Sequence, residues 1–148
     1  MSSTLTMYYR LNSYVDYLSD QGILPHLVTI AALKATARTS YFLPGIDVRF
    51  SGGIEGEADV FGVRDGQVLS GEVKTSASEF TDEQIIHDVE LSSKLGADLH
   101  IMAAMDSITE EQRQRAEQEC EAHGIGLIVL QQSDLLPGDA VPGDQELS

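Results

Sequence analysis

Two runs of β-forming residues occupy the middle of the chain, and helical patterns lie on both sides of them. The runs are residues 57–64 and 67–75, and Asp65-Gly66 separates them. An Asp-Gly pair between such runs is typical of a tight hairpin, because the turn requires positive φ angles. We therefore predict two antiparallel strands joined by a two-residue turn.

Apolar residues at three- and four-residue spacing predict helices elsewhere. One helix is expected over residues 7–19 and a second over 27–39. Two more follow the capping-box residues Thr81 and Thr109, and they end near Leu95 and His123. Shorter apolar runs predict further strands at 46–50, 99–105 and 125–130, while Pro44-Gly45 is read as a break.

The predicted order is helices, three strands, helix, strand, helix, strand. Strands separated by a full helix run parallel, whereas the tight turn makes the central hairpin antiparallel. The fold class is therefore α/β, with a mixed sheet flanked by helices: an αβββαβ core with an added C-terminal αβ unit. We expect one domain over residues 1–136 and an acidic, flexible tail over 137–148, which is rich in turn-forming residues.

Composition narrows the class of protein. The chain has 148 residues, 42% of them hydrophobic, which is enough for a packed core and too much for a disordered chain. No apolar run approaches the length of a membrane span, and we expect neither a membrane partner nor a secretory signal. The single cysteine, Cys120, excludes an internal disulfide framework. A cytoplasmic location is the expected default.

The charge is strongly acidic and unevenly distributed. Nine basic and 24 acidic residues give a net charge of −15, which opposes non-specific binding to nucleic acid. Residues 1–50, however, carry four basic and three acidic side chains, so a polyanion would approach from this side. The candidate DNA-binding residues are Lys34, Arg38 and Arg49. Lys34 and Arg38 lie four residues apart on one helix face, and two ordinary surface cations are an equally good interpretation.

Polar side chains fall at alternate positions of the predicted hairpin. Because successive side chains of a strand point to opposite faces, Asp59 shares a face with Glu57, and Glu72 shares one with Lys74. If the two polar faces coincide, Asp59, Glu72 and Lys74 converge at one end of the hairpin. Two carboxylates and an amine suit a hard divalent cation and a water nucleophile. Glu57 is either an accessory ligand or a solvent-facing strand end.

These residues, Asp59 and Gly71-Glu72-Val73-Lys74, resemble the motif of the PD-(D/E)xK nuclease superfamily, and the predicted elements follow its order. Ala58 stands where the name-giving proline would be. The resemblance implies a restriction-endonuclease-like fold. It also implies that Asp59, Glu72 and the Val73 carbonyl bind Mg²⁺ or Mn²⁺, and that Lys74 positions or activates the attacking water.

The helix after the hairpin offers a second set of candidates. Gln84 is an accessory candidate that could face the substrate, but Asp88 stands where the glutamine motif of RecB-type nucleases has a tyrosine. We interpret His87 and Asp88 as part of a solvated helix face. The other histidines, His26, His100 and His123, show no metal-ligand spacing and are interpreted as structural.

The functional expectation is a metal-dependent nuclease that hydrolyses DNA phosphodiester bonds. One alternative is that Lys74 is simply a structural ion-pair partner of Glu72 or Asp59. Another is a non-catalytic acidic protein on the same scaffold, which binds a protein partner or mimics DNA through its charge. The sequence leaves open whether the protein works alone, as a homodimer or within a larger assembly.

Overall fold

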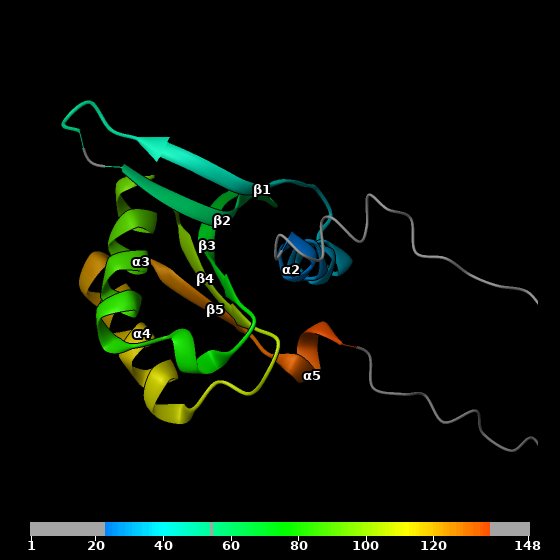
Figure 1. Cartoon of the computed structure of the whole chain (residues 1–148). Coiled ribbons are helices and arrows are strands. Elements are labelled where there is room, and N and C mark those ends of the chain that lie inside the picture. Colours follow the sequence, from blue (N-terminus) through cyan, green and yellow to red (C-terminus); the bar gives the residue numbers. More distant parts are fainter. Residues whose placement is uncertain (1–22, 54, 137–148) are drawn as a thin grey trace, which may run out of the picture.

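Five strands form one continuous mixed sheet in a computed structural model of the chain, which describes residues 23–53 and 55–136 (Figure 1). The strand order is β1-β2-β3-β4-β5. Neighbours β1–β2 and β2–β3 are antiparallel, and β3–β4 and β4–β5 are parallel. The sequence predicted the antiparallel hairpin of β2 and β3 and the parallel direction of the strands that follow a helix. The strand bounds are Ser40–Arg49 for β1, Glu55–Arg64 for β2, Gln67–Lys74 for β3, Leu99–Ala104 for β4 and Gly126–Leu130 for β5.

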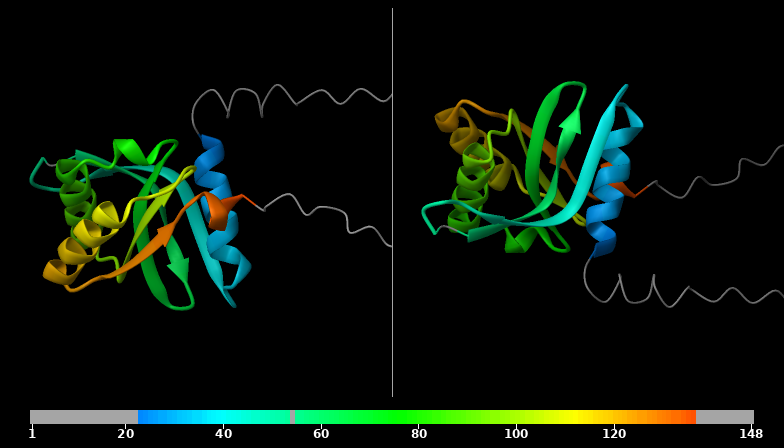
Figure 2. Two further views of the ribbon diagram at one scale, coloured as in Figure 1. Left: turned by 90° about the horizontal axis from the view of Figure 1, so that it is seen from below. Right: turned by 90° about the horizontal axis from the view of Figure 1, so that it is seen from above.

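Helices cover both faces of this sheet (Figures 1 and 2). Their bounds are Ile23–Ala35 for α2, Asp82–Lys94 for α3, Glu110–His123 for α4 and Gln132–Leu135 for α5, with a 3₁₀ turn at Ala77–Glu79. Helices α2 and α5 lie on one face, and α3 and α4 lie on the other. Within the described residues, no helix combines the length and apolar character needed to cross a membrane.

Period-two alternation divides the core into two layers. In β4, Ile101 and Ala103 pack toward α2 and α5, whereas Met102 and Ala104 pack toward α3 and α4. Both layers are mostly aliphatic, and both sides of β4 are buried. A strand buried on both faces reads as a continuous apolar run, which is why the sequence predicts β4 well.

The turn between β2 and β3 is anchored to the end of α2. Asp65 and Gly66 have φ angles of +49° and +85°, as a tight hairpin turn requires. The Asp65 carboxylate also accepts hydrogen bonds from the backbone N–H groups of Arg38 and Thr39, each at 2.9 Å. The turn residue therefore fixes both the register of the hairpin and the exit of the chain from α2.

Two boundaries differ from the sequence predictions. The strand expected at 46–50 is the longer β1, and Pro44-Gly45 lies inside it. An edge strand tolerates this, because the missing proline N–H faces no partner strand and Gly45 adopts a positive φ of 57°. The helix expected over 27–39 is α2, which begins and ends four residues earlier. The helix expected over 7–19 and the tail 137–148 lie outside the described residues.

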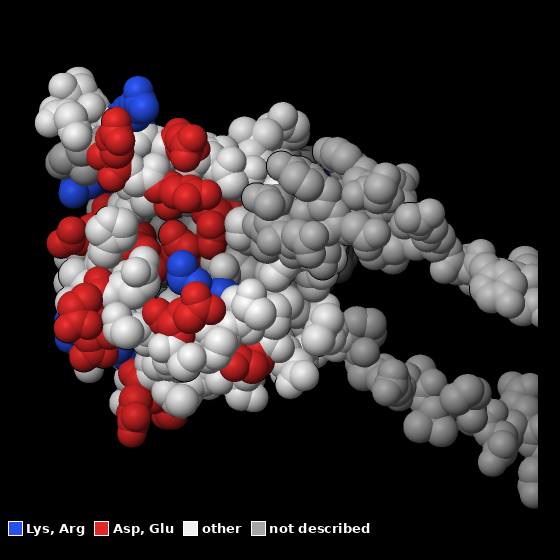
Figure 3. Space-filling view, in the orientation of Figure 1, with Lys and Arg blue, Asp and Glu red and all other residues white. Residues whose placement is uncertain are grey.

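Acidic side chains are spread widely over the face shown in Figure 3, where Lys and Arg are few. Three of the described arginines form ion pairs with neighbouring acids: Arg49 with Glu55, Arg113 with Glu110, and Arg115 with Glu119. Lys34 and Arg38, in contrast, form no ion pair with another described residue. These two cations lie at and just beyond the C-terminal end of α2, and the exposed Lys94, in the last turn of α3, likewise forms no ion pair with a described residue.

Replacing Gly71 with alanine should destabilise the fold by about 1–3 kcal/mol, the usual range for overpacking. Gly71 pairs with Val60 on one side and Ile101 on the other, and a Cβ atom there would overlap the backbone oxygen of Ile101. The matched control is Gly52→Ala, because a Cβ atom at Gly52 would meet open space. Urea denaturation measures the difference in the free energy of unfolding, and equal stability of the two variants would contradict the close approach of β3 to β4.

Candidate functional site

The candidate site lies where β2 separates from β3. The ladder between these strands ends at the pair Val60–Gly71, and β2 continues alongside β1 alone. The Asp59 carboxylate occupies the resulting opening, where its Oδ2 accepts a 2.8 Å hydrogen bond from the backbone N–H of Val73. A buried N–H group without a strand partner is energetically costly. This contact therefore stabilises the fork, which is the point where β2 separates from β3, and it fixes the position of the Asp59 carboxylate.

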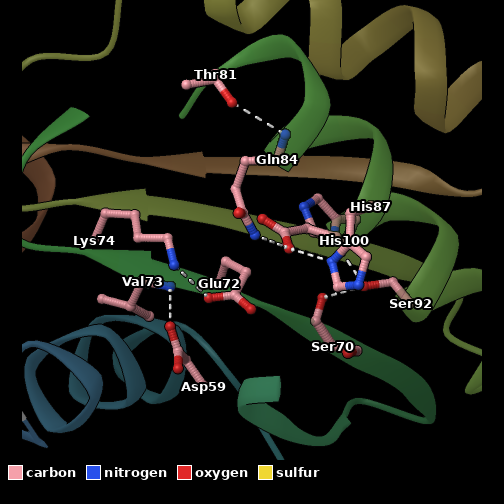
Figure 4. Close-up of polar contacts among 11 residues, drawn as sticks. Asp59, Ser70, Glu72, Val73, Lys74, Thr81, Gln84, His87, Ser92 and His100 are labelled. Atoms are coloured by element: carbon pink, nitrogen blue, oxygen red, sulfur yellow. Dashed lines mark hydrogen bonds and ion pairs between the residues drawn. The ribbon is translucent and has the colours of Figure 1, made fainter. Parts of the chain in front are cut away.

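Glu72 and Lys74 flank Val73 in β3, and their side chains point toward each other (Figure 4). Lys74 Nζ is 3.1 Å from Glu72 Oε2, and their side chains are 21% and 10% exposed. Glu72 also lies within hydrogen-bonding reach of Asp59. The structure thus brings Asp59, Glu72 and Lys74 together at one end of the hairpin, as alternation predicts.

The carboxyl groups of Asp59 and Glu72 have too little positive charge near them for both to be ionised. Burial raises the pKa of Glu72 from 4.5 to about 9, and the hydrogen bond with Asp59 and the negative charge of Asp88 act in the same direction. Lys74 opposes this shift without cancelling it. A hydrogen bond between two carboxyl groups needs a proton on one of them, so Glu72 is the protonated partner in the metal-free protein.

Lys74 remains a cation in this environment. Burial by itself would lower the pKa of Lys74, but the Glu72 carboxyl, and behind it Asp59 and Asp88, outweigh burial and raise it. Its ammonium group is therefore a hydrogen-bond donor at neutral pH and not a free base.

Asp88 is a third acidic residue of the site that sequence reasoning missed. It lies on α3 and is 2% exposed, so its interpretation as part of a solvated face is wrong. Its Oδ1 accepts a 2.7 Å hydrogen bond from the Gln84 side-chain amide and lies 3.3 Å from His87 Nδ1. Burial raises the pKa of Asp88, although the contacts with His87 and Gln84 oppose this. The spacing of four residues between Gln84 and Asp88 was the signal for this pair.

His26 is a second residue that the sequence did not assign to the site. It lies in the first turns of α2, on the opposite side of the sheet from α3, and its Nε2 is 3.4 Å from Asp59 Oδ1. Asp59 therefore contacts groups from both faces of the sheet through the fork. No spacing rule finds such a contact, because 33 residues separate the two side chains in sequence.

The remaining candidates do not form one site. Glu57 is exposed on β2, consistent with the solvent-facing alternative. Arg49 lies at the far end of β1 from α2, about 30 Å away at 3.3 Å per strand residue, and forms an ion pair with Glu55. The alternating pattern around Arg49 gave no indication of which end of the strand faces the helix.

A separate polar cluster lies deeper between α3 and the sheet. Ser92 Oγ is 2.7 Å from His100 Nδ1 and also donates to the backbone oxygen of Ser70 (Figure 4). Burial lowers the pKa of His100 to about 4, so its imidazole is neutral. These contacts anchor α3 to β3 and β4, which agrees with the structural interpretation of His100.

The donor set of the site suits a hard divalent cation with an incomplete protein shell. Asp59 and Glu72 offer carboxylate oxygens, and His26 adds an imidazole nitrogen beside Asp59. In the described part of the chain, no three His, Cys, Asp or Glu side chains enclose a metal ion by themselves. Mg²⁺ is typically held by one or two carboxylates and keeps several waters, so two protein carboxylates are a sufficient anchor.

Comparison with known proteins adds no assignment: no family model, curated protein or solved structure matches the chain. The arrangement of side chains in the site is therefore the basis for assigning a function.

In the absence of divalent cations, the protein should lose stability as pH rises through the neutral range. Between pH 4.5 and 9 the folded state keeps the Glu72 proton that the unfolded state has released, so the free energy of unfolding falls with pH. The slope reaches at most about 1.4 kcal/mol per pH unit. Glu72→Gln should remove this contribution and melt a few degrees above the wild type at pH 8.

Thermal melts at pH 6 and pH 8 in EDTA measure this effect. The control is Glu83→Gln, which removes an exposed acid from the first turn of α3 and should retain the wild-type pH dependence. Identical pH dependence in the wild type and Glu72→Gln would show that Glu72 is ionised in the folded protein.

Proposed function

We propose that this protein is a Mg²⁺- or Mn²⁺-dependent deoxyribonuclease with the restriction-endonuclease-like fold of the PD-(D/E)xK superfamily. The observation that carries the proposal is the convergence of Asp59, Glu72 and Lys74 at the fork between β2 and β3. The mixed five-stranded sheet with helices on both faces is compatible with this fold.

Each residue has a role that follows from its contacts. Asp59 is held in place by Val73 N–H and would supply one cation ligand, and Glu72 would supply the second after losing its proton. A bound divalent cation lowers the pKa of water and neutralises charge on a phosphate. Lys74 is charged and points at the Glu72 carboxylate, so it would orient the attacking water and donate hydrogen bonds to the phosphate.

His26 would act from the other side of the fork. Its Nε2 faces Asp59, while its Nδ1 is buried and has no partner among the described residues. In the metal-free protein an imidazolium would pair with the Asp59 carboxylate, and a neutral imidazole would be an additional nitrogen ligand for the cation. Both arrangements make α2 part of the site, and not only a cover for the sheet.

The DNA backbone would follow α2 from the site to its C-terminal end. Lys34 and Arg38 are exposed there, and Arg64 lies beside them, with its Nη2 donating to Thr36 Oγ1 at 2.8 Å. This group of cations, and not one that includes Arg49, is the part of the acidic surface where a phosphate would bind with least repulsion.

The net charge of −15 favours a second candidate function, a non-catalytic protein that binds a partner through its acidic surface or mimics DNA. The acidic face in Figure 3 fits that role. The ion pair of Lys74 with Glu72 would then be structural. Metal binding separates the two functions, because an acidic binding protein has no need of a cation at the fork.

We expect the wild type to cleave DNA in Mg²⁺ or Mn²⁺ and Lys74→Ala to lose that activity by at least about two orders of magnitude, as is typical for a catalytic hydrogen-bond donor. Plasmid, branched-junction and single-stranded DNA should be assayed in parallel. Lys94→Ala is the control, because Lys94 is an exposed lysine in the last turn of α3. A wild type that binds metal but cuts none of these forms would favour a different substrate.

The same variant tests the structural alternative. If Lys74 is only an ion-pair partner, its removal leaves a buried carboxylate without compensation, at a cost of about 3–5 kcal/mol. If Lys74 is catalytic, Lys74→Ala should retain metal binding and a cooperative melt. A strongly destabilised Lys74→Ala, together with a wild type that binds no metal, would favour the acidic binding protein.

Replacing both Lys34 and Arg38 with alanine should weaken DNA binding and reduce its dependence on salt. Each lost phosphate contact lowers the slope of log K against log salt by about one unit. Binding titrations at several salt concentrations measure this, with Arg49→Ala as the control at the distant end of β1. An unchanged slope in the double variant would place the DNA surface elsewhere.

A further inference from the structure

One oxygen of Asp88 is buried without a hydrogen-bond donor. The side chain is 1% exposed, and its Oδ1 is already engaged by Gln84 and His87. Its Oδ2 has no partner among the described residues. A buried carboxylate oxygen without a donor is unfavourable, so a native structure that keeps one calls for a physical explanation.

The charge of Asp88 acts on the candidate site. The negative charge of Asp88 helps to raise the pKa values of both Glu72 and Lys74, which places the carboxylate near these side chains. Gln84, which donates to Asp88, reaches from α3 toward the ends of Glu72 and Lys74 (Figure 4). Asp88 is therefore close enough to Glu72 and Lys74 for its charge to act on both of them.

We propose that Asp88 is a positioning residue whose free Oδ2 accepts hydrogen bonds from the water shell of a divalent cation held by Asp59 and Glu72. This inference rests on the proposed function, because it needs a cation at the fork. The cation is bound to Asp88 through water and not directly.

The composition of the site supports an indirect contact. Asp59 and Glu72 would supply two carboxylates, and Mg²⁺ held by one or two carboxylates keeps several waters, so water would fill the other positions around the cation. Metal-bound waters are strong donors and need acceptors that are held in place. Lys74 is protonated and can only donate hydrogen bonds, whereas the unpartnered Oδ2 of Asp88 can accept them.

Gln84 has a defined part in this arrangement. Its side-chain amide donates to Oδ1 of Asp88, one helical turn away, and so fixes the carboxylate with Oδ2 free. His87 contacts the same Oδ1, but its side chain is 61% exposed and lies on the solvent side. A purely structural carboxylate would be expected to use both of its oxygens. Here both neighbours bind one oxygen, and the other has no partner among the described residues.

Calorimetric titration of the metal-free full-length protein with Mg²⁺ tests the proposal without reference to catalysis. Asp88→Asn should weaken Mg²⁺ binding about tenfold or more, the range typical of residues that orient metal ligands indirectly. The matched control is Glu57→Gln, which removes one negative charge from an exposed position two residues from Asp59. Glu57→Gln should change the affinity much less.

A second probe separates contact through the hydration shell from direct coordination. Hexaamminecobalt(III) has the shape of a hydrated cation, and its ammine ligands do not exchange, so it binds through charge attraction and hydrogen bonds from its shell and never by direct coordination. Its affinity should fall in Asp88→Asn at least as much as that of Mg²⁺. The spectrum of bound Mn²⁺ in electron paramagnetic resonance should also differ between the wild type and Asp88→Asn, because the water shell is held differently.

Each outcome has a definite consequence. If the wild type binds Mg²⁺ and Asp88→Asn binds it equally well, or is affected no more than Glu57→Gln, the role of Asp88 is overturned and the proposed function stands. If the wild type binds no divalent cation, the proposed function fails and this inference fails with it. Asp88→Ala removes the buried charge altogether and provides the same comparison if Asp88→Asn does not melt cooperatively.

Discussion

The hydrogen bond from Val73 N–H to the Asp59 carboxylate is the contact on which the site depends. A mixed sheet in which β2 must leave β3 to follow β1 exposes backbone groups of β3 at the point of separation. Asp59 satisfies one of these groups with one carboxylate oxygen, and its other oxygen lies 3.4 Å from His26 Nε2. The same interaction therefore completes the fold and presents an acidic group in an opening that both faces of the sheet can reach.

The metal-free site carries more negative charge than its single lysine balances. Asp59, Glu72 and Asp88 surround Lys74, and the protein limits the repulsion by holding a proton on Glu72. The proton on Glu72 reduces the repulsion among the three carboxyl groups but leaves some of their oxygens without a partner. A divalent cation in place of the proton would interact with more of these oxygens. Under the proposed function, metal binding would release this proton, and metal affinity would depend on pH through the same residue that sets the pH dependence of folding.

The sequence predicted the elements that are determined by residues close together in the chain. The Asp65-Gly66 turn, the Thr81 and Thr109 caps and the buried run of β4 are each determined by residues within a few positions of one another. Alternation also brought Asp59 and Glu72 to one face, because register follows from the turn. Pro44-Gly45 was misread, since only the position of β1 at the sheet edge makes a proline acceptable there.

The parts of the site that the sequence did not predict come from tertiary packing. Asp88 belongs to a polar stripe of α3 by its spacing, and tertiary packing buries Asp88 while its neighbour His87 stays 61% exposed. His26 meets Asp59 because α2 crosses the fork, which no periodicity encodes. Natural sequences are locally consistent except where function requires otherwise. Three buried acids, one with an unused oxygen, form such an exception, and an apolar replacement would pack the same space at lower cost. The retention of all three around one lysine is therefore better explained by a charged ligand than by stability.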